Sequence, residues 1–377
     1  MALITYLTKI HFDFGAVRLL AEELTALGIE RPLVVTDAGI VAAGLLDRVR
    51  EAMPSDMPVT VYDGTPANPT EPAVRDALAL YREADCDGVV AVGGGSSIDL
   101  AKGVRLLATH EPPLAQYAMI EGGVARIQAN VAPMIAVPTT AGTGSEVGRG
   151  GIIILDDGRK VGIVSPYMIP SVAICDPDLT LDLPSGLTAA TGMDAMAHCI
   201  ETFISPVENP PAEGIAIEGL RRASAHIERA VADGLDRDAR WNMMMASMMG
   251  AMAFQKGLGA VHAMSHPLGS LQHLKLHHGT LNAVVMPAVL RFNADHTGDK
   301  YRRMAVAMGL APDADLPVHI AALNQRLGLP ENLRQMGVEE DMLPEMARQA
   351  MLDHCNPTNP RPATEEDYLA LFREAIR

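Results

Sequence analysis

The first half of the chain alternates between short apolar runs and amphipathic stretches, and this alternation restricts the fold more than any other feature. The apolar runs are typical of strands and cover residues 33–36, 88–92, 134–137, 151–155 and 172–175. Helix-like stretches lie between several of them, at 16–27, 40–52, 71–84 and 97–109. Strands that alternate with helices form a parallel sheet with helices on both faces. The sequence therefore predicts an α/β domain.

The pattern changes near Pro184, after which the chain reads as helix. The helical stretches cover residues 186–204, 212–233, 238–256, 258–274 (interrupted), 281–294 and 365–376. A chain of 377 residues is long enough for two domains. We therefore predict an α/β domain over residues 1–182 and an all-helical domain over residues 183–377, with a ligand in the cleft between them.

Charge and cysteine usage limit the classes of partner and compartment. Acidic residues outnumber basic ones 46 to 30, which gives a formal net charge of −16 and disfavours nucleic acid or an anionic membrane as partner. No apolar run approaches the roughly 20 residues that span a bilayer, and residues 1–15 lack the pattern of a signal peptide. The cysteines (Cys86, Cys175, Cys199 and Cys355) are scattered, which indicates reduced thiols in a cytoplasmic protein.

A glycine-rich motif, Gly93–Asp99, follows one predicted strand and opens a helix. Glycines let a ligand approach the backbone, and a helix N-terminus offers unpaired N–H groups, so the motif suits a pyrophosphate. A plain tight turn is the alternative. The usual GxGxxG fingerprint is absent, because Val147 stands where the third glycine after Gly142 and Gly144 would be.

Two more features lie at the ends of predicted strands. The Thr- and Gly-rich segment Pro138–Glu146 follows one strand, where it either lines a cofactor crevice or forms an ordinary loop. Asp37 follows the first strand. It either accepts hydrogen bonds from an adenosine ribose and repels a 2′-phosphate, or caps the next helix.

Histidines and one aspartate recur at helical spacing in the second half. Asp194 and His198 are four residues apart, as are His262 and His266, and His277–His278 follow shortly after. Side chains four apart on a helix share one face. An aspartate with several histidines in this pattern predicts a divalent metal site, and the lack of nearby cysteines favours a catalytic one. A metal acting as Lewis acid, together with a nicotinamide as hydride carrier, indicates redox chemistry on an alcohol or carbonyl.

Several segments together resemble the iron-containing (group III) alcohol dehydrogenase family. They are Val92–Lys102, Pro138–Glu146, Gly192–His198 and Gly257–Gly269, followed by His278-Gly279 and Asn359–Pro362. The resemblance implies a Rossmann-like N-terminal domain, a helical C-terminal domain, NAD and one divalent metal, usually Fe²⁺ and sometimes Zn²⁺. It also implies a small alcohol or aldehyde substrate and a homo-oligomer.

The resemblance also implies roles for single residues. Asp194, His198, His262 and His278 match the metal ligands, with His277 as the alternative last ligand because the segment after His266 is two residues longer than in common members. His266 matches a histidine near the nicotinamide that binds no metal, so we expect it to relay a proton. Asp37 matches the acid that favours NAD over NADP. Other cofactor positions are matched by Asn68, Gly94, Gly95, Ser96, Ser97, Thr139, Thr140, Ser145 and Lys160.

Lys256 bears on the substrate, because it precedes the ligand His262 by six residues. It either holds an anionic end of the substrate or is a surface lysine. The segments at 6–17, 254–259 and 277–293 resemble members that interconvert 4-hydroxybutyrate and succinate semialdehyde. We predict the same reaction, with Lys256 or Arg149 holding the carboxylate. The alternatives are a general primary alcohol or diol oxidoreductase and, with less support, a dehydroquinate-synthase-like lyase, which needs a basic cluster that the C-terminal half lacks.

Overall fold

The computed structural model describes residues 8–271 and 273–377. The start of the 6–17 segment and residues 1–7 of the region considered for a signal peptide lie outside the described residues. Within them the chain divides into two compact units. An α/β unit comprises residues 8–140 and 145–182, and a helical unit comprises residues 141–144 and 183–377.

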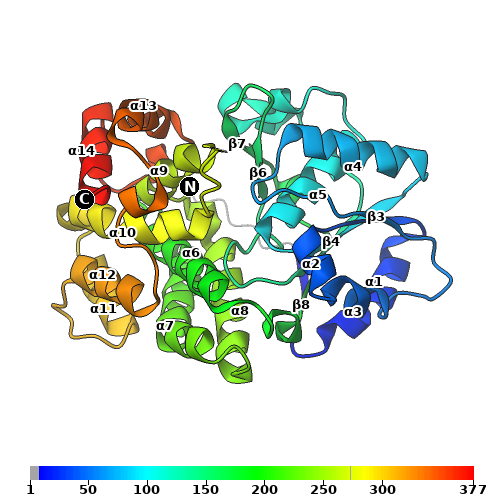
Figure 1. The fold of residues 1–377 in the computed structure, drawn as a ribbon, viewed down its shortest axis with the longest axis horizontal. Coiled ribbons are helices and arrows are strands. Elements are labelled where there is room, and N and C mark those ends of the chain that lie inside the picture. Colours follow the sequence, from blue (N-terminus) through cyan, green and yellow to red (C-terminus); the bar gives the residue numbers. More distant parts are fainter. Residues whose placement is uncertain (1–7, 272) are drawn as a thin grey trace. The chain divides into compact units, whose positions relative to one another are not determined.

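The α/β unit is built on a six-stranded sheet in the order β1-β8-β5-β4-β2-β3, and all its neighbouring strands pair in parallel. Figure 1 labels β3, β4 and β8 of this sheet. The strands are β1 (Lys9–Phe12), β2 (Pro32–Val35), β3 (Thr60–Tyr62), β4 (Gly88–Gly93), β5 (Met134–Pro138) and β8 (Val172–Cys175). The predicted parallel sheet is therefore confirmed.

The sheet has an apolar core on each face, which explains why its central strands are continuous apolar runs. Side chains alternate between the two faces along β2: Leu33 and Val35 pack in one core with residues of α4 (Glu71–Glu83) and α5 (Gly95–Leu107). Val34 packs in the other core with α1 (Leu20–Leu27) and α3 (Leu45–Arg50). Helices therefore cover both faces, as the alternation of strands and helices predicts.

Two predicted elements differ in the structure. The strand expected at 151–155 is β6 (Gly150–Ile154), which pairs antiparallel with β7 (Lys160–Val164) in a separate hairpin. Its turn contains Gly158 at φ +84°, a conformation that glycine adopts without strain. The helix expected at 40–52 is divided into α2 (Ala38–Ala42) and α3 by Gly44 at φ +70°.

The described part of the chain after residue 183 contains helices and no strand, as predicted. Its central helix is α6 (Ser185–Ile204), which is buried from Thr188 onward and contacts α7, α8 and α10. A helix buried on all sides is mostly apolar or small around its circumference, so the buried polar side chains Asp194, His198 and Glu201 of α6 are exceptions. The other long helices are α7 (Pro210–Ala232), α8 (Arg237–Met252), α9 (Ala260–Gly269), α10 (His278–Asn293), α11 (Lys300–Ala307), α12 (Leu316–Arg326), α13 (Leu343–Leu352) and α14 (Glu365–Ala375). Among the described helices, none has the length and apolarity needed to cross a bilayer.

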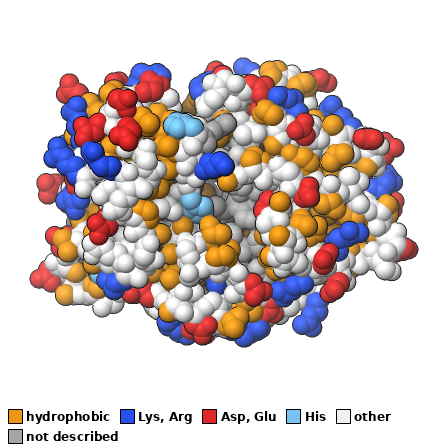
Figure 2. All heavy atoms as spheres, viewed as in Figure 1, with side chains coloured by type: hydrophobic (Ala, Val, Ile, Leu, Met, Phe, Trp, Pro, Cys, Tyr) orange, Lys and Arg blue, Asp and Glu red, His pale blue; other side chains and the backbone are white. Residues whose placement is uncertain are grey.

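The surface drawn in Figure 2 carries acidic and basic side chains interspersed among neutral ones. Some of these charges form exposed ion pairs, such as Arg75–Asp156 and Arg326–Glu228, both at 2.7 Å. Exposed pairs contribute at most about 1 kcal/mol each, so the buried cores carry the stability of both units.

Candidate active site

One aspartate and three histidines meet inside the helical unit. Asp194 and His198 extend from α6, His262 from α9, and His278 from the first position of α10. The Oδ1 atom of Asp194 lies 3.5 Å from His198 Nε2, 3.8 Å from His262 Nε2 and 3.6 Å from His278 Nε2. A tetrahedral ion with bonds of about 2.1 Å holds its ligands about 3.4 Å apart. The four donor atoms therefore fit a single divalent ion.

Burial keeps two of these imidazoles neutral. It lowers the pKa of His198 to about 4 and that of His262 to about 3. The Nδ1 atom of His198 lies 3.2 Å from the Gly142 carbonyl oxygen, and Nδ1 of His262 lies 2.6 Å from Glu201 Oε2. Each acceptor holds the ring proton on Nδ1 and leaves Nε2 unprotonated on the side of Asp194, as a metal ligand requires.

Asn282 lies among the donor atoms. Its amide nitrogen donates to Asp194 Oδ1 at 2.7 Å and lies 3.2 Å from Nε2 of both His262 and His278. Its amide oxygen is buried without a hydrogen-bond partner among the described residues. An unpaired buried acceptor is rare, and it fits a site whose polar contacts are completed by an ion with a water ligand.

A glycine explains how His278 reaches this cluster. A Cβ at Gly279 would lie only 2.2 Å from the Ala190 carbonyl oxygen, so only glycine lets α10 approach α6 this closely. His278 then lies beside Asp194, one residue from that contact. The alternative ligand His277 is exposed, precedes α10 as its N-cap residue and is not part of the four-residue group.

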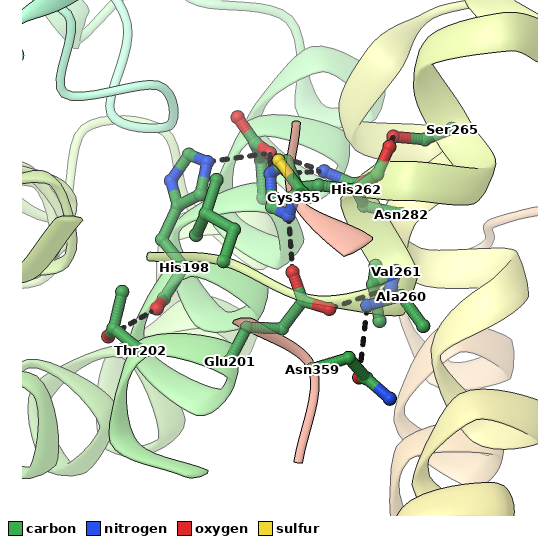
Figure 3. Close-up of polar contacts among 12 residues, drawn as sticks. His198, Glu201, Thr202, Ala260, Val261, His262, Ser265, Asn282, Cys355 and Asn359 are labelled. Carbon is green, nitrogen blue, oxygen red and sulfur yellow. Dashed lines mark hydrogen bonds and ion pairs between the residues drawn. The ribbon is translucent and has the colours of Figure 1, made fainter. Parts of the chain in front are cut away.

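Glu201 is a functional residue that the sequence interpretation missed. It accepts hydrogen bonds from the Val261 backbone N–H at 2.7 Å and from His262 Nδ1 at 2.6 Å (Figure 3). Burial raises the pKa of Glu201 to about 7, although backbone N–H groups, among them that of Val261, act in the opposite direction. Its position, seven residues after Asp194 and therefore on the same face of α6, is the signal that identifies it.

We expect Glu201→Gln to weaken metal binding by about 10- to 100-fold, because outer partners of ligating histidines typically contribute this much. Competition against a chromophoric chelator measures the affinity, and Glu218→Gln, a change of a partly exposed ion-paired glutamate on α7, is the matched control. Equal affinity in the Glu201 variant and the wild-type protein would show that Glu201 has no part in holding the metal.

His266 lies next to the four-residue group but is not part of it. Its ring lies 5.9 Å from that of His262 and 5.5 Å from that of His278, and its Nδ1 lies 2.9 Å from Asp353 Oδ2. Burial raises the pKa of Asp353, but the charges of His266 and His354 outweigh it and hold the pKa well below its usual range. Asp353 is therefore an ionised acceptor that fixes the ring proton of His266 on Nδ1 and leaves Nε2 able to accept another.

In the α/β unit, the glycine-rich motif forms the turn between β4 and α5. Gly93 has φ +151°, and a Cβ there would lie 2.6 Å from Ser97 Oγ. Gly94 precedes α5 without a side-chain cap, so the first backbone N–H groups of the helix remain available to an anion. Ser96 Oγ donates to the Ala67 carbonyl at 2.6 Å and ties this turn to a neighbouring loop.

Asp37 lies beside this turn and also caps a helix. Its Oδ1 accepts from two backbone N–H groups of α2 at 2.9 and 3.1 Å, and its Oδ2 accepts from Ser97 Oγ at 3.3 Å. Both interpretations of Asp37 are thus compatible with its position. Elsewhere in the α/β unit, Asn68 Oδ1 accepts from Lys160 Nζ at 2.9 Å, which brings together two of the predicted cofactor positions.

Unpaired hydroxyls mark the carboxyl ends of two strands next to β4. The side-chain oxygens of Thr36, after β2, and Thr139, after β5, are buried without partners among the described residues. The Thr140 side chain borders the same turn, 3.3 Å from where a Cβ on Gly94 would lie. Ligands bind α/β sheets at the carboxyl ends of their strands, so these residues fit a nucleotide cofactor.

The Ser145 side chain forms hydrogen bonds with two residues of α5. Its Oγ donates to Asp99 Oδ1 at 2.5 Å and accepts from Lys102 Nζ at 2.7 Å. The fully buried Lys102 also donates to the carbonyl oxygens of Ser145, Gly148 and Gly150. Asp99 and Lys102 therefore organise the loop that follows Ser145, which explains the acidic residue at the end of the glycine-rich motif Gly93–Asp99.

Lys256 lies in a buried ion pair. Its side chain has no exposed surface, and its Nζ lies 2.6 Å from Glu213 Oε1, an oxygen that Lys300 also contacts at 3.2 Å. Burial lowers the pKa of Lys256 to about 8, although Glu213 acts against this shift. The prediction that Lys256 holds a substrate carboxylate is therefore not supported, because the ammonium is enclosed and already neutralised. The alternative of a surface lysine is excluded as well.

Arg149, the second candidate for the carboxylate, is partly buried in the α/β unit. Burial lowers the pKa of its guanidinium. No carboxylate of the described residues forms an ion pair with it. A partly desolvated guanidinium without a counter-charge is a suitable partner for an anionic ligand.

Comparison with known proteins finds a family match for each of the two units. The family model "Iron-containing alcohol dehydrogenase" matches residues 8–177, and that of the C-terminal part of this family matches residues 188–376. The chain is 61% identical to the 4-hydroxybutyrate dehydrogenase of Cupriavidus necator over all of both sequences.

Solved structures of other proteins share the fold of this chain. A 1,3-propanediol oxidoreductase is 38% identical, covers 99% of this chain and 100% of its own, and superposes with a TM-score of 0.90. Sulfoacetaldehyde reductase from Bifidobacterium kashiwanohense, solved in complex with NAD⁺, is 28% identical, with a TM-score of 0.88 over 100% of this chain and 98% of its own.

Proposed function

The chain belongs to the iron-containing alcohol dehydrogenase family, and on this premise we propose that it interconverts 4-hydroxybutyrate and succinate semialdehyde with NAD. The observation that carries this proposal is the 61% identity over the full length of the 4-hydroxybutyrate dehydrogenase. The 1,3-propanediol oxidoreductase is less similar, at 38% identity.

Asp194, His198, His262 and His278 would hold the divalent ion, Fe²⁺ or Zn²⁺, since a carboxylate and three imidazoles suit both metals. When bound, such an ion lowers the pKa of an alcohol and polarises a carbonyl. The protein's contribution is to keep the imidazoles of His198 and His262 neutral and correctly oriented, through burial and through the acceptors Gly142 and Glu201.

The α/β unit would hold NAD, whose nicotinamide accepts or donates the hydride. The N–H groups that begin α5 would bind the pyrophosphate, and Asp37 would accept from the adenosine ribose and exclude a 2′-phosphate. The further positions proposed to line the cofactor are Asn68, Gly94, Gly95, Ser96, Ser97, Thr139, Thr140, Ser145 and Lys160.

His266 would move the proton. In alcohol oxidation its Nε2 accepts the hydroxyl proton, and in aldehyde reduction it returns one. The ionised Asp353 at Nδ1 stabilises the imidazolium that forms in between. The hydrogen bond to Asp353 thus fixes the tautomer of His266 before the substrate binds.

Arg149 would bind the substrate carboxylate. Removing a hydrogen bond to a charged group costs about 1.5–3 kcal/mol, so we expect Arg149→Met to raise KM for succinate semialdehyde by about 10- to 100-fold and to leave KM for butyraldehyde unchanged. NADH consumption measures both constants. Arg126→Met, a change of an exposed arginine in the same unit, is the control. An unchanged KM for succinate semialdehyde would remove Arg149 from the substrate site.

The substrate itself is tested with a panel of aldehydes and NADH. Succinate semialdehyde, butyraldehyde and 3-hydroxypropionaldehyde have similar lengths, but only the first carries a carboxylate. The proposal requires the highest kcat/KM for succinate semialdehyde. Preference for the hydroxyaldehyde would instead favour a diol oxidoreductase, the function suggested by the 1,3-propanediol relative.

All four cysteines lie among the described residues and are buried free thiols, which supports a cytoplasmic location. The homo-oligomer remains a prediction.

A further inference from the structure

A second group of potential metal ligands lies beside the first in the helical unit. It consists of His266 on α9 and of Asp353, His354 and Cys355, which directly follow α13. One donor atom from each of the four lies within 4.8 Å of all the others. Since α13 packs against α9, the turn at its end brings three consecutive ligand-type side chains to His266.

The carboxylate of Asp353 contacts two imidazoles, one through each oxygen. Its Oδ2 is 2.9 Å from His266 Nδ1 and its Oδ1 is 3.6 Å from His354 Nδ1. The two rings stack with centroids 5.3 Å apart and an interplanar angle of 13°. One carboxylate and two imidazole nitrogens therefore already converge on a small volume.

Cys355 adds a sulfur donor. The residue is buried, and burial raises the pKa of its thiol well above the usual value, so the thiol keeps its proton at neutral pH. Binding to a metal would replace the S–H bond by a sulfur–metal bond and release the proton to solvent. The thiolate and the Asp353 carboxylate then supply two negative charges, which balance a divalent ion.

We propose that His266, Asp353, His354 and Cys355 form a second metal site, selective for a divalent ion of borderline softness such as Zn²⁺ or Co²⁺. Two imidazoles, a carboxylate and a thiolate are ligands that such ions prefer. Tetrahedral coordination places donors about 3.3–3.8 Å apart. Small side-chain rotations therefore suffice to bring the four donor atoms, which lie within 4.8 Å of one another, to these distances. The His354 side chain is 16% exposed and provides the path of entry.

Occupancy of this site has a consequence that rests on the proposed function. The ion would replace the hydrogen bond between His266 and Asp353. The imidazole of His266 could then no longer relay a proton. A second equivalent of Zn²⁺ is therefore expected to inhibit the dehydrogenase, and the inhibition depends on His354 and Cys355.

Cobalt tests the site without reference to activity. Full-length protein carrying one equivalent of Fe²⁺ is titrated with Co²⁺ under anaerobic conditions, and thiolate-to-cobalt charge-transfer absorption is followed in the near ultraviolet. Only the second group contains a thiol, so cobalt at the Asp194 cluster gives no such band. We expect the band to saturate at one further equivalent and to disappear in Cys355→Ser. In His354→Ala, apparent affinity is expected to fall at least about tenfold, since even indirect partners of a metal contribute that much.

Cys86→Ser, a change of a buried thiol in the α/β unit, is the matched control and should keep the band. Absence of the band in wild-type protein, or its persistence in Cys355→Ser, overturns the site. Inhibition by Zn²⁺ is measured separately by NADH consumption. A cobalt band without zinc inhibition overturns the effect on His266 and leaves the site. Failure of the substrate proposal leaves the cobalt result unaffected.

Discussion

Asp194→Ala is expected to empty the metal site and to lower kcat/KM for aldehyde reduction by at least about a thousandfold, because Lewis-acid catalysis supplies several kcal/mol. Asp194 is the one carboxylate in the four-residue group, and its Oδ1 lies within 4 Å of Nε2 of each of the three histidines. Its loss removes both a ligand and the negative charge that attracts the ion.

Metal content by plasma mass spectrometry and NADH consumption, measured on the same samples, test this expectation. Asp299→Ala, a change at an exposed position of the helical unit, controls for handling of the protein. Circular dichroism shows whether the variant is folded. A folded Asp194 variant that keeps one equivalent of metal and wild-type turnover would contradict the assignment of this cluster.

His266→Ala is expected to lower kcat by about 10²- to 10⁴-fold, the usual contribution of general acid–base catalysis, while the variant keeps one equivalent of metal. His266 lies outside the four-residue group and is paired with Asp353. The expected loss is therefore in proton transfer and not in metal binding. Added imidazole should restore part of the rate, because it can replace the missing proton acceptor.

The metal analysis distinguishes this role from the alternative. Loss of metal in His266→Ala would make His266 a ligand of the catalytic ion, and unchanged kcat would remove it from the mechanism. Asp353→Asn is the companion variant. It keeps the shape of the acceptor but removes its charge, so a smaller fall in kcat is expected.

The sequence was sufficient for the central strands, because β2, β4, β5 and β8 are buried on both faces and therefore appear as uninterrupted apolar runs. It was not sufficient for β3, which has three partly buried residues, or for the pairing of β6. Periodicity identifies an extended segment but does not show which neighbour it pairs with. The hairpin depends on a turn whose conformation only the structure shows.

The four proposed metal ligands were predicted because two of them share an i, i+4 spacing on one helix and the others lie in recognisable motifs. Glu201 and Asp353 were missed because each acts on a histidine that is distant in sequence: Glu201 on His262 and Asp353 on His266. Lys256 was misjudged for a related reason. Its counter-charge, Glu213, is 43 residues away, and sequence spacing to His262 cannot reveal that pair.

Anomalous diffraction at the iron edge, from crystals of iron-loaded protein, locates the catalytic ion without relying on activity. We predict one strong peak bounded by Asp194, His198, His262 and His278, with His277 outside its coordination sphere. A principal peak at any other position, including the group around Cys355, would contradict this prediction.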